Sequence, residues 1–487
     1  PVVYLSVINV QLENEDDQFY TLPLMAAPED EAKSVLEEHP SAPLAWLEIN
    51  GTRERRLVYD ATVNPDFWAT LFQWWESGSK GRSLKGVYTA EPSEAAKGDK
   101  PETIRLLTGE QSNTSAIVND DYFVKLYRRL EEGPNPEKEM LDHLTSVDFT
   151  FTPRLHGTID FRRSNRKYTL GVLQEALPVE MDGWSYALSA TNRFLDRVEN
   201  SVFPREQARA TGPPRSMDDW TSGSTTEESA PVWLEDVAPE FISLARVLGV
   251  RTAEMHLSLS QAESEDLRPI EAPPEAGSAL ADRLYTELAE TRDLIDRHED
   301  AIGGDAPSET AWQEAEARIQ DLRGLDGPHQ RIRIHGDYHL GQLLRAEGDF
   351  YILDFEGEPA RPLTERRLRE NALRDVAGML RSLEYAILAA WQEHTGTDPA
   401  YAPWIDALLR WSEMTFLNAY ADTAEEAEFL PPAPARYSFL WAYLFHKAIY
   451  EVRYELNNRP NWVWLPLRGL RRLLGQEEEK VSSIPES

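Results

Sequence analysis

The sequence predicts an α+β protein with a bilobal architecture, in which a β-rich N-terminal part precedes a mainly helical C-terminal part. Short, alternating strand-like segments separated by polar turns fill residues 1–178, whereas helical periodicity prevails from Trp184 onward. The length supports a division as well, because 487 residues exceed what one hydrophobic core usually organises, so that two or three domains are expected.

The N-terminal part divides further. Residues 1–90 are expected to form a subdomain of their own, with four strand-like segments and an aromatic helix that begins at Asn64-Pro65. A polar, charged linker follows over 91–101. The rest of the stretch 91–178 is predicted to form a β-rich lobe in the order strand, loop, strand, helix and strand pair.

The C-terminal part, residues 179–487, is predicted to be mainly helical. Residues 204–232 interrupt it with a segment rich in Pro, Gly, Ser, Thr and charged residues, which is expected to be a mobile insertion. Residues 331–359 predict a strand, a loop, a strand, a turn, a strand and a second loop. Long helices are expected from 363–395 nearly to the end of the chain.

Composition narrows the functional classes. The formal charge is −34, which argues against a nucleic-acid partner or an anionic membrane, because both need a basic surface. No apolar run reaches the length of about 18 residues that a transmembrane helix needs. The N-terminus has no basic leader of the secretory type. There is no cysteine, which excludes disulfides, thiolate metal sites and a cysteine nucleophile. We therefore expect a cytoplasmic protein.

The pattern that carries chemistry is His335-Gly336-Asp337-Tyr338-His339-Leu340-Gly341-Gln342, followed twelve residues later by Asp354-Phe355-Glu356. Apolar segments precede both pieces, so Asp337, Gln342 and Asp354 are predicted to lie at adjacent strand ends. Phosphoryl transfer uses such a set: one carboxylate accepts the hydroxyl proton, and a second carboxylate with an amide holds magnesium against the phosphates. The spacing matches the H-R-D-x-x-x-x-N and D-F-G motifs of protein kinases. The alternatives are a zinc site at His335 and His339, which Gly336 disfavours by arguing against a helix, and a structural turn.

Lys125 is the second candidate. It lies in the apolar strand-like segment YFVKLYRR, where a kinase N-lobe carries the lysine that binds the α- and β-phosphates and pairs with a helix glutamate. Glu137 and Glu139 follow at the start of a predicted helix, and Glu139 is the favoured partner. The alternative is an ordinary edge-strand lysine.

Two further segments are assigned to nucleotide binding by their order in the chain. The loop Gly109–Ser115 lies between two strands, and hydroxyl, amide and backbone N–H groups there are able to cradle phosphate; an ordinary hairpin turn is the alternative. The segment around Gln174, Glu175 and Leu177 ends the last strand before the helical part, where a hinge would hydrogen-bond adenine. The loop residues assigned to phosphate are Ser112, Asn113, Thr114 and Ser115.

A third segment, residues 450–464, combines carboxylates with aromatic rings. It begins as a helix in which Tyr450/Tyr454 and Glu451/Glu455 are four residues apart, and Pro460 ends it. Carboxylates that accept sugar hydroxyls beside aromatic rings that stack on sugar faces indicate a carbohydrate site. The alternative is that the aromatic residues belong to the core and the charged residues form a solvated ladder.

Together these motifs resemble those of the bacterial maltokinases, which belong to the aminoglycoside-phosphotransferase-like kinases. The resemblance rests on seven segments and extends over nearly the whole chain. These segments are EQSNTS (110–115), the Lys125 strand, GPNPEKE (133–139), HGDYHLGQ (335–342), ILDFEGEPARPLTERR (352–367), LRDVAGMLRS (373–382) and YEVRYELNNRPNW (450–462).

The resemblance implies a protein-kinase-like fold with a cap subdomain at residues 1–90. It also implies transfer of the γ-phosphoryl group of ATP to the anomeric hydroxyl of maltose, which gives maltose 1-phosphate for α-glucan synthesis from trehalose. Asp337 would be the catalytic base, Gln342 and Asp354 the Mg²⁺ ligands, and Lys125 the phosphate clamp. The positions that match the family's sugar site are His339, Glu451, Tyr454 and Trp462.

Some members of the family are fused to a trehalose synthase, which would then be a partner. The core motifs do not fix the sugar, because similar proteins phosphorylate glucosamine. A kinase for glucosamine or an aminoglycoside is therefore the alternative to a maltokinase. A pseudokinase that serves as a scaffold for trehalose synthase is a third reading, which the presence of Lys125, Asp337, Gln342 and Asp354 together disfavours.

Overall fold

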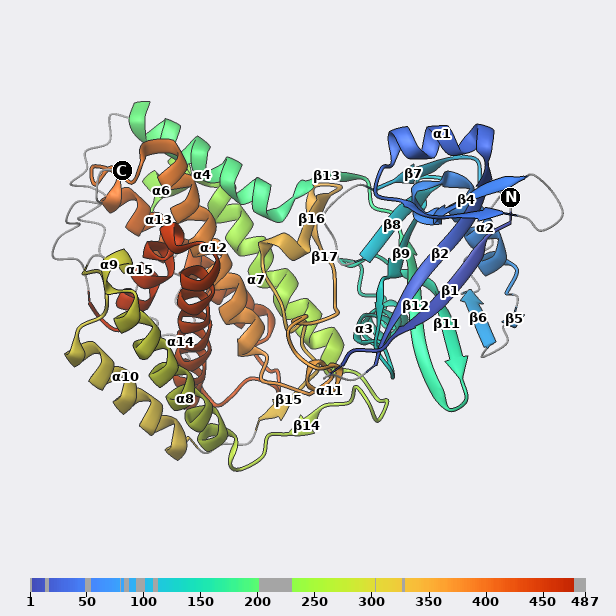
Figure 1. Ribbon diagram of the computed structural model, residues 1–487. Coiled ribbons are helices and arrows are strands. Elements are labelled where there is room, and N and C mark those ends of the chain that lie inside the picture. Colours follow the sequence, from blue (N-terminus) through green and yellow to red (C-terminus); the bar gives the residue numbers. More distant parts are fainter. Residues whose placement is uncertain are drawn as a thin grey trace. The chain divides into compact units, whose positions relative to one another are not determined.

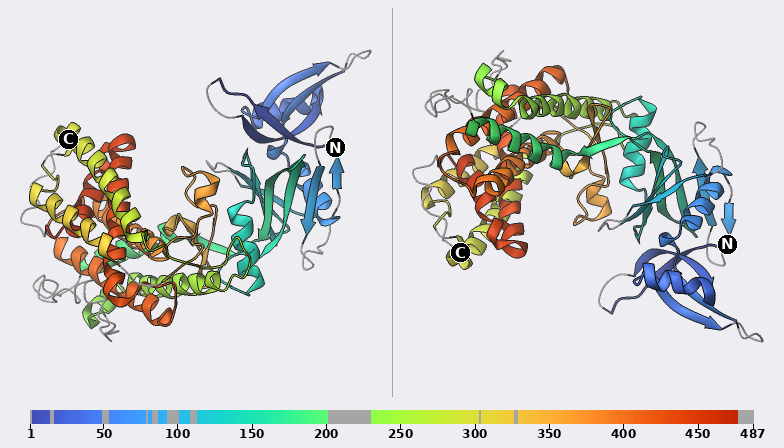
Figure 2. Two further views of the ribbon diagram at one scale, coloured as in Figure 1. Left: turned by 90° about the horizontal axis from the view of Figure 1, so that it is seen from below. Right: turned by 90° about the horizontal axis from the view of Figure 1, so that it is seen from above.

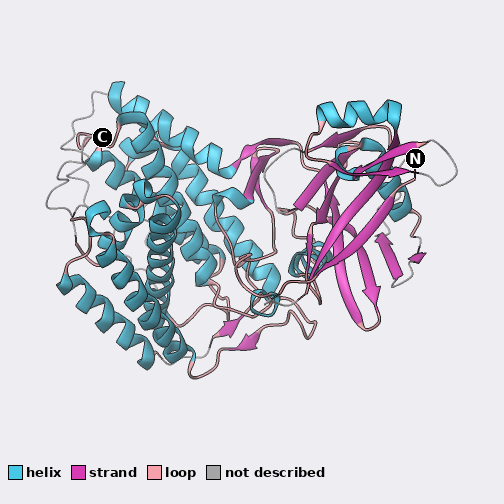
Figure 3. Cartoon of the chain, viewed as in Figure 1, coloured by secondary structure: helices cyan, strands magenta, loops and turns pink. Residues whose placement is uncertain are grey.

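The computed structural model divides into two units, residues 1–178 with 361–365 and residues 179–360 with 366–487 (Figure 1). Strands predominate in the first unit and helices in the second (Figure 3). The structure describes residues 2–13, 17–48, 54–78, 80–82, 87–92, 101–107, 113–200, 230–302, 304–325 and 329–476. The insertion predicted at 204–232 lies outside these residues up to position 229.

The first unit contains two antiparallel sheets. In the first sheet the strands follow the order β1-β2-β4-β3, and the short β10 also pairs with β2. Helix α1 packs on β2 and β4, so that Ala32, Leu57 and Tyr59 lie in a small core. The bounds are β1 Tyr4–Val10, β2 Gln18–Pro28, α1 Glu29–Glu38, β3 Pro43–Glu48, β4 Arg55–Asp60 and β10 Arg129–Leu130.

The second sheet of this unit has seven strands in the order β5-β6-β11-β12-β9-β8-β7, all antiparallel to their neighbours. Helix α2 buries Trp68, Phe72 and Trp75 against this part of the unit, and the side chain of Asn64 caps its first turn. The bounds are α2 Pro65–Glu76, β5 Lys80–Arg82, β6 Val87–Pro92, β7 Ile104–Leu106, β8 Asn113–Val118, β9 Tyr122–Tyr127, α3 Pro136–Ser146, β11 Leu155–Arg163 and β12 Arg166–Glu175.

The boundary of the N-terminal subdomain differs from the sequence prediction. The division expected at residue 90 falls inside β6, which belongs to the seven-stranded sheet. The last strand of the five-stranded sheet to begin before that point is β4, which ends at Asp60. Alternation along a strand reports which face is buried but not which strand is its partner. The two sheets therefore looked alike in the sequence.

The second unit is mainly helical. Helix α12 contacts α4, α13 and α14, and α7 packs along α13 (Figures 1 and 2). A three-stranded sheet in the order β13-β16-β17 and a small β14-β15 pair complete it. The helices are α4 Gly183–Asn200, α6 Val232–Val237, α7 Pro239–Ser260, α8 Ala276–Arg297, α9 Glu299–Ile302, α10 Glu309–Asp321, α12 Leu373–Thr395, α13 Ala402–Thr423, α14 Ala433–Asn458 and α15 Trp464–Leu473. Helix α11, Leu363–Arg366, belongs to the first unit up to Glu365. The strands are β13 Val179–Asp182, β14 Ile270–Glu271, β15 Gln330–Arg331, β16 Leu343–Ala346 and β17 Asp349–Ile352.

Within the described ranges, none of the helices combines the length and the apolar character that crossing a membrane requires. The core of the second unit instead comes from amphipathic helices. In α12, fifteen residues are buried, and among them are Asp375, Arg381 and Glu384. Buried ionic groups are rare unless they are paired. These three residues are therefore expected to form ion pairs or hydrogen bonds in addition to packing.

Candidate active site

The segment that begins with His335 forms a loop between β15 and β16. One buried carboxylate of α12 fixes its backbone: Asp375 accepts hydrogen bonds from the N–H groups of His335 at 2.7 Å and Gly336 at 2.9 Å. Gly336 has a φ of 83°, a conformation that side-chain-bearing residues rarely adopt. The next residue, Asp337, has a side chain that is 22% exposed. The loop therefore presents the predicted base from a rigid backbone.

Asp375 is itself held by a second layer of buried groups. His256 of α7 lies 3.2 Å from its Oδ2 through Nε2 and 2.9 Å from the hydroxyl of Tyr420 in α13 through Nδ1. Burial alone would raise the pKa of Asp375, but the hydrogen bond and charge of His256, with contributions from His335 and the Gly336 N–H, leave its pKa lowered. Asp375 is thus a buried anion that joins three helices to the loop.

Gln342 and Asp354 lie at the ends of neighbouring strands. The N–H of Leu353 donates to the carbonyl of Gln342 at 2.9 Å, and the side chain of His335 lies 2.7 Å from the Leu353 carbonyl through Nε2. Asp354 has a φ of 62°, so the chain turns sharply just after β17. An amide and a carboxylate from adjacent strand ends form an all-oxygen donor set of the kind Mg²⁺ prefers. The residues present therefore fit the predicted metal ion.

Lys125 of β9 is buried in the first unit and pairs with Glu137 of α3, its Nζ lying 2.9 Å from Oε2. The favoured partner in the sequence, Glu139, was therefore wrong. Glu137 also accepts hydrogen bonds from the hydroxyl of Tyr127 at 2.6 Å and from Nε2 of Gln174 at 3.0 Å. Whether Glu137 or Glu139 pairs with Lys125 depends on which face of α3 packs against the sheet. Neither helix propensity nor residue spacing shows which face that is.

The predicted phosphate loop is only partly described. Ser112 lies outside the described residues, and β8 already begins at Asn113. Thr114 Oγ1 accepts a hydrogen bond from Nε of Arg128 at 2.7 Å. Ser115 is buried, and among the described groups its hydroxyl has no partner. The hydroxyl of Ser115 therefore lies inside the unit, whereas Thr114 is half-buried. A role of this loop in phosphate binding remains a prediction.

The predicted hinge follows β12. The N–H of Glu175 donates to the backbone carbonyl of Arg154 at 2.9 Å, and the N–H of Ala176 donates to the backbone carbonyl of Asp121 at 2.8 Å. The side chain of Gln174 is committed to Glu137. Leu177 is half-buried and directly precedes Pro178, the last residue of the first unit in this stretch. A role of this segment in adenine binding remains a prediction, now centred on the backbone of Leu177.

The predicted sugar segment lies on α14 and the turn after it. Lys447, Tyr450, Glu451 and Tyr454 share one face of the helix, at the i, i+3, i+4 and i+7 spacing. Burial raises the pKa of the Tyr450 hydroxyl, and the charges of Glu358 and Asp337 raise it further. The Tyr450 side of α14 therefore lies within electrostatic range of the loop that carries Asp337.

Two exposed aromatic rings extend this face. Tyr454 is 46% exposed and Trp462 is 37% exposed. The guanidinium of Arg459 lies 5.7 Å from the centre of the Tyr454 ring and 5.6 Å from that of Trp462. Arg459 is in turn fixed by two bonds to the buried Glu455, at 2.6 and 3.0 Å. Glu455 is therefore a structural anchor, and the two rings are available to stack on a ligand.

His339 lies beside the predicted base, its Nε2 being 4.0 Å from Oδ2 of Asp337. Burial lowers its pKa, against the opposing charge of Asp337. Its Nδ1 accepts a hydrogen bond from the N–H of Gly341 at 3.0 Å, so a neutral ring carries its proton on Nε2. His339 thus presents a hydrogen-bond donor on the side of Asp337.

Sequence reasoning missed several residues that support the site, namely Asp375, His256, Arg381 and Lys447. Asp375 and Arg381 lie in the segment LRDVAGMLRS, to which no individual role was assigned. The available signal was the presence of charged residues inside an apolar helical pattern. For His256 no such signal existed, because a single histidine in an amphipathic helix is unremarkable.

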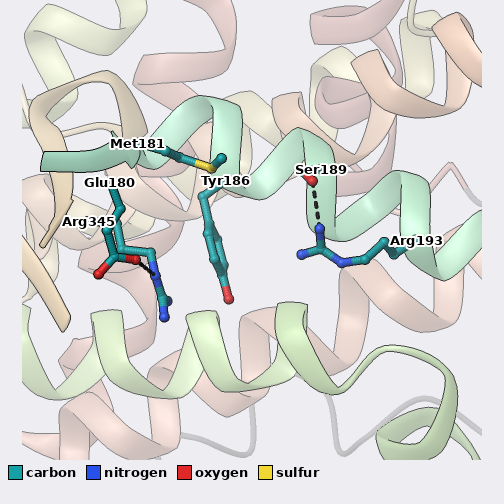
Figure 4. A pocket seen from close by; sticks show the side chains of 6 residues that line it. All are labelled: Glu180, Met181, Tyr186, Ser189, Arg193 and Arg345. Atoms are coloured by element: carbon teal, nitrogen blue, oxygen red, sulfur yellow. Dashed lines mark hydrogen bonds and ion pairs between the residues drawn. The ribbon is translucent and has the colours of Figure 1, made fainter. Parts of the chain in front are cut away.

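A separate depression of about 240 Å³ lies between β13, β16 and α4 (Figure 4). Its charged groups are already paired: Arg345 Nε lies 2.9 Å from Glu180, and Arg193 donates to Ser189 at 2.6 Å. It contains none of the residues that the sequence pointed to, and its lining residues are Glu180, Met181, Tyr186, Ser189, Arg193 and Arg345. We assign it no role.

Comparisons with known proteins place this geometry in context. No protein-family model matches the chain. A glucosamine kinase of Mycolicibacterium smegmatis is 27% identical over 390 residues, which are 79% of this chain and 82% of that protein. A glucosamine kinase of Streptacidiphilus jiangxiensis is 27% identical over 421 residues, which are 82% of this chain and 84% of that protein.

Solved structures agree with the sequence relatives. The structure of a glucosamine kinase in complex with glucosamine, ADP and inorganic phosphate has a TM-score of 0.62 at 21% identity and covers 97% of this chain and 94% of that one. A crystal form of a glucosamine kinase has a TM-score of 0.59 at 22% identity and covers 97% of this chain and 93% of that one. The predicted α+β fold class is confirmed, and the chain has the fold of the glucosamine kinase structures, with a β-rich N-terminal part and a helical C-terminal part.

Proposed function

We propose that this protein is an ATP-dependent sugar kinase. The observation that carries the proposal is the loop in which Asp375 fixes Asp337 while paired strand ends bring Gln342 beside Asp354. A partly exposed carboxylate on a rigid loop next to an oxygen-donor pair is what phosphoryl transfer to a hydroxyl requires. The sequence relatives, both named glucosamine kinases, support the same reaction class.

The residues take the following roles. Asp337 accepts the proton of the attacking sugar hydroxyl; the oxygen of that hydroxyl bonds to the γ-phosphorus, and the bond from this phosphorus to the bridging oxygen breaks to release ADP. Gln342 and Asp354 would hold Mg²⁺, which neutralises charge on the phosphates. Lys125, held by Glu137 at 2.9 Å, would bind the phosphates of the nucleotide. His339 donates a hydrogen bond beside the base.

Glucosamine is the leading acceptor in this proposal. The sequence relatives carry that name, and they favour the amino sugar over the maltose that the motifs alone suggested. The face of α14 agrees, because Oε1 of Glu451 accepts no hydrogen bond among the described residues and would accept one from an ammonium group. The site would then bind the sugar through its amino group and present a hydroxyl to Asp337.

Maltose is the second candidate for the acceptor, and one observation favours it. The exposed rings of Tyr454 and Trp462 lie 5.7 and 5.6 Å from one guanidinium, that of Arg459. Two such rings offer more stacking surface than a single pyranose ring uses. A disaccharide would account for both rings, with maltose 1-phosphate as the product.

The deciding experiment measures ADP release with ATP, Mg²⁺ and a panel of sugars containing glucosamine, maltose, glucose and an aminoglycoside. Turnover of glucosamine but not maltose would support the leading acceptor, and the reverse would establish the second candidate. Asp337→Asn should lower kcat by about two to four orders of magnitude, the range that a general base contributes, while nucleotide binding persists. Sugar phosphorylation by that variant at the wild-type rate would remove Asp337 from the role of base.

A further inference from the structure

A chain of alternating charges runs through the second unit and ends at the predicted sugar face. Arg381 of α12 donates from both Nε and Nη2 to Oε2 of Glu451, at 3.0 and 2.6 Å. Its Nη1 donates to Glu384. Glu384 also accepts from Nη2 of Arg472 in α15 at 3.1 Å, and Nη1 of Arg472 donates to Glu413 of α13 at 2.7 Å. Four helices therefore share one buried ionic chain.

Exposure distinguishes Glu451 from the other carboxylates of this chain. Three carboxylates (Glu384, Glu413, Glu451) share the guanidinium groups of Arg381 and Arg472, and the charge of Lys447 also acts on Glu451. The side chains of Glu384 and Glu413 are 1% and 7% exposed, against 12% for Glu451. Both hydrogen bonds to Glu451 go to Oε2, and among the described residues its Oε1 accepts none. Oε1 of Glu384 also lacks a partner there, but Glu451 is the more exposed of the two and therefore the carboxylate that a ligand would reach.

Arg381 holds this carboxylate in one orientation. Its side chain is only 1% exposed, and its guanidinium lies directly against the backbone of α15. A Cβ atom added to Gly469 would approach Nη1 of Arg381 to 2.0 Å, so only glycine leaves room for the guanidinium. A carboxylate fixed by two N–H groups on one oxygen keeps its second oxygen pointing along a single direction.

We propose that Arg381 is a positioning residue for the acceptor: it orients Glu451 so that Oε1 accepts a hydrogen bond from, or pairs with an ammonium group of, the sugar. The inference rests on the proposed sugar kinase activity and adds a specific dependence of acceptor binding on α12 and α15. Glu451 makes the contact with the sugar, and Arg381 acts only through Glu451. Gly469 allows the guanidinium to take its place.

The test is a steady-state comparison of Glu451→Gln, Arg381→Met, Arg381→Lys and the double variant, with glucosamine and maltose as acceptors. Because a hydrogen bond to a charged group contributes about 1.5–3 kcal/mol, the KM of the acceptor should rise about ten- to hundredfold in Glu451→Gln and in Arg381→Met. The KM of ATP should stay within about twofold of the wild type. The double variant should be no worse than the poorer single variant, because both changes remove the same contact.

Matched controls separate positioning from general stability. Arg472→Met removes the ion pairs of Arg472 with Glu384 and Glu413, which belong to the same chain but do not include Glu451. It should lower the melting temperature with little change in the KM of the acceptor. Arg381→Lys keeps a buried cation and should recover part of the affinity, and Gly469→Ala should raise the KM of the acceptor as Arg381→Met does. Arg381→Met with an unchanged acceptor KM, or with equal changes in both KM values, would overturn the inference. A wild-type enzyme that phosphorylates no sugar in the panel would instead overturn the proposed function and this inference with it.

Discussion

At the scale of single residues, the buried carboxylates of both units each hold several partners at once. Glu137 accepts hydrogen bonds from Lys125, Tyr127 and Gln174, which ties β9, α3 and β12 together. A carboxylate that is 2% exposed must be compensated in this way, because an unpaired buried charge is costly. The contacts that hold Lys125 in place are therefore part of the core.

Glu137→Gln tests this double role. The change leaves the ammonium of Lys125 without its counter-ion, and breaking a buried ion pair costs about 3–5 kcal/mol. We expect a lower free energy of unfolding by urea denaturation and a higher KM for ATP. Glu139→Gln, two positions along the same helix turn, is the matched control, and it should cost less than about 1 kcal/mol. Equal effects of the two variants would contradict the pairing with Glu137.

At the scale of elements, α7, α12 and α13 are joined through Asp375 to the loop that carries Asp337. His256 and Tyr420 fill the space behind this carboxylate, and Tyr338 of the loop lies 3.1 Å from the hydroxyl of Thr252 in α7. Each of these polar groups is buried and satisfied, so the loop has one well-defined conformation. Rigid helices, rather than the loop's own residues, thus determine where Asp337 lies.

This anchor predicts a specific pH dependence of stability. Because the pKa of Asp375 is lowered in the folded protein, its contribution to stability is present above the unfolded value of about 3.9 and is lost as the pH falls through the lower folded value. Asp375→Asn should therefore be less stable than wild type near neutral pH and should approach it in acid. Unfolding free energies measured across this pH range check the prediction.

Tyr420→Phe is the control for that experiment. It removes only the outermost hydroxyl of the network, so it should lower the stability slightly and leave the acid dependence in place. An Asp375→Asn variant with the same acid profile as the wild type would show that Asp375 does not titrate in the predicted way.

Some features of these elements could be predicted from the sequence and others could not. The spacing of Gln342 and Asp354 was sufficient to predict that they lie at neighbouring strand ends. For Asp337 the prediction was wrong, because β15 ends at Arg331 and pairs with β14, so that Asp337 lies in a loop. The partner of Lys125 was wrongly expected at Glu139, since two glutamates in the first turn of a helix look equivalent until the packed face is known. Asp375 escaped notice because its role depends on a loop about 40 residues away along the chain.

At the scale of the whole molecule, charge is the dominant feature. The 84 acidic and 50 basic residues give 50 − 84 = −34. Many of the described arginines are already committed to ion pairs, such as Arg251 with Asp349 at 2.6 Å and Arg197 with Glu240 at 2.6 Å. The excess carboxylates are therefore left to repel one another, and self-repulsion of this kind destabilises a compact state.

Added salt should consequently stabilise the protein. The Debye length falls from about 10 Å at 0.1 M to about 3 Å at 1 M, so repulsion among exposed carboxylates is screened more than the short, partly buried pairs are. We expect the melting temperature at pH 7 to rise steadily between low and molar NaCl. The same titration near pH 4.7, where the net charge approaches zero, should give a much smaller rise. A melting temperature that falls with NaCl at pH 7 would mean that the ion pairs outweigh the repulsion, and an equal rise at both pH values would assign the effect to salt exclusion from the surface rather than to charge.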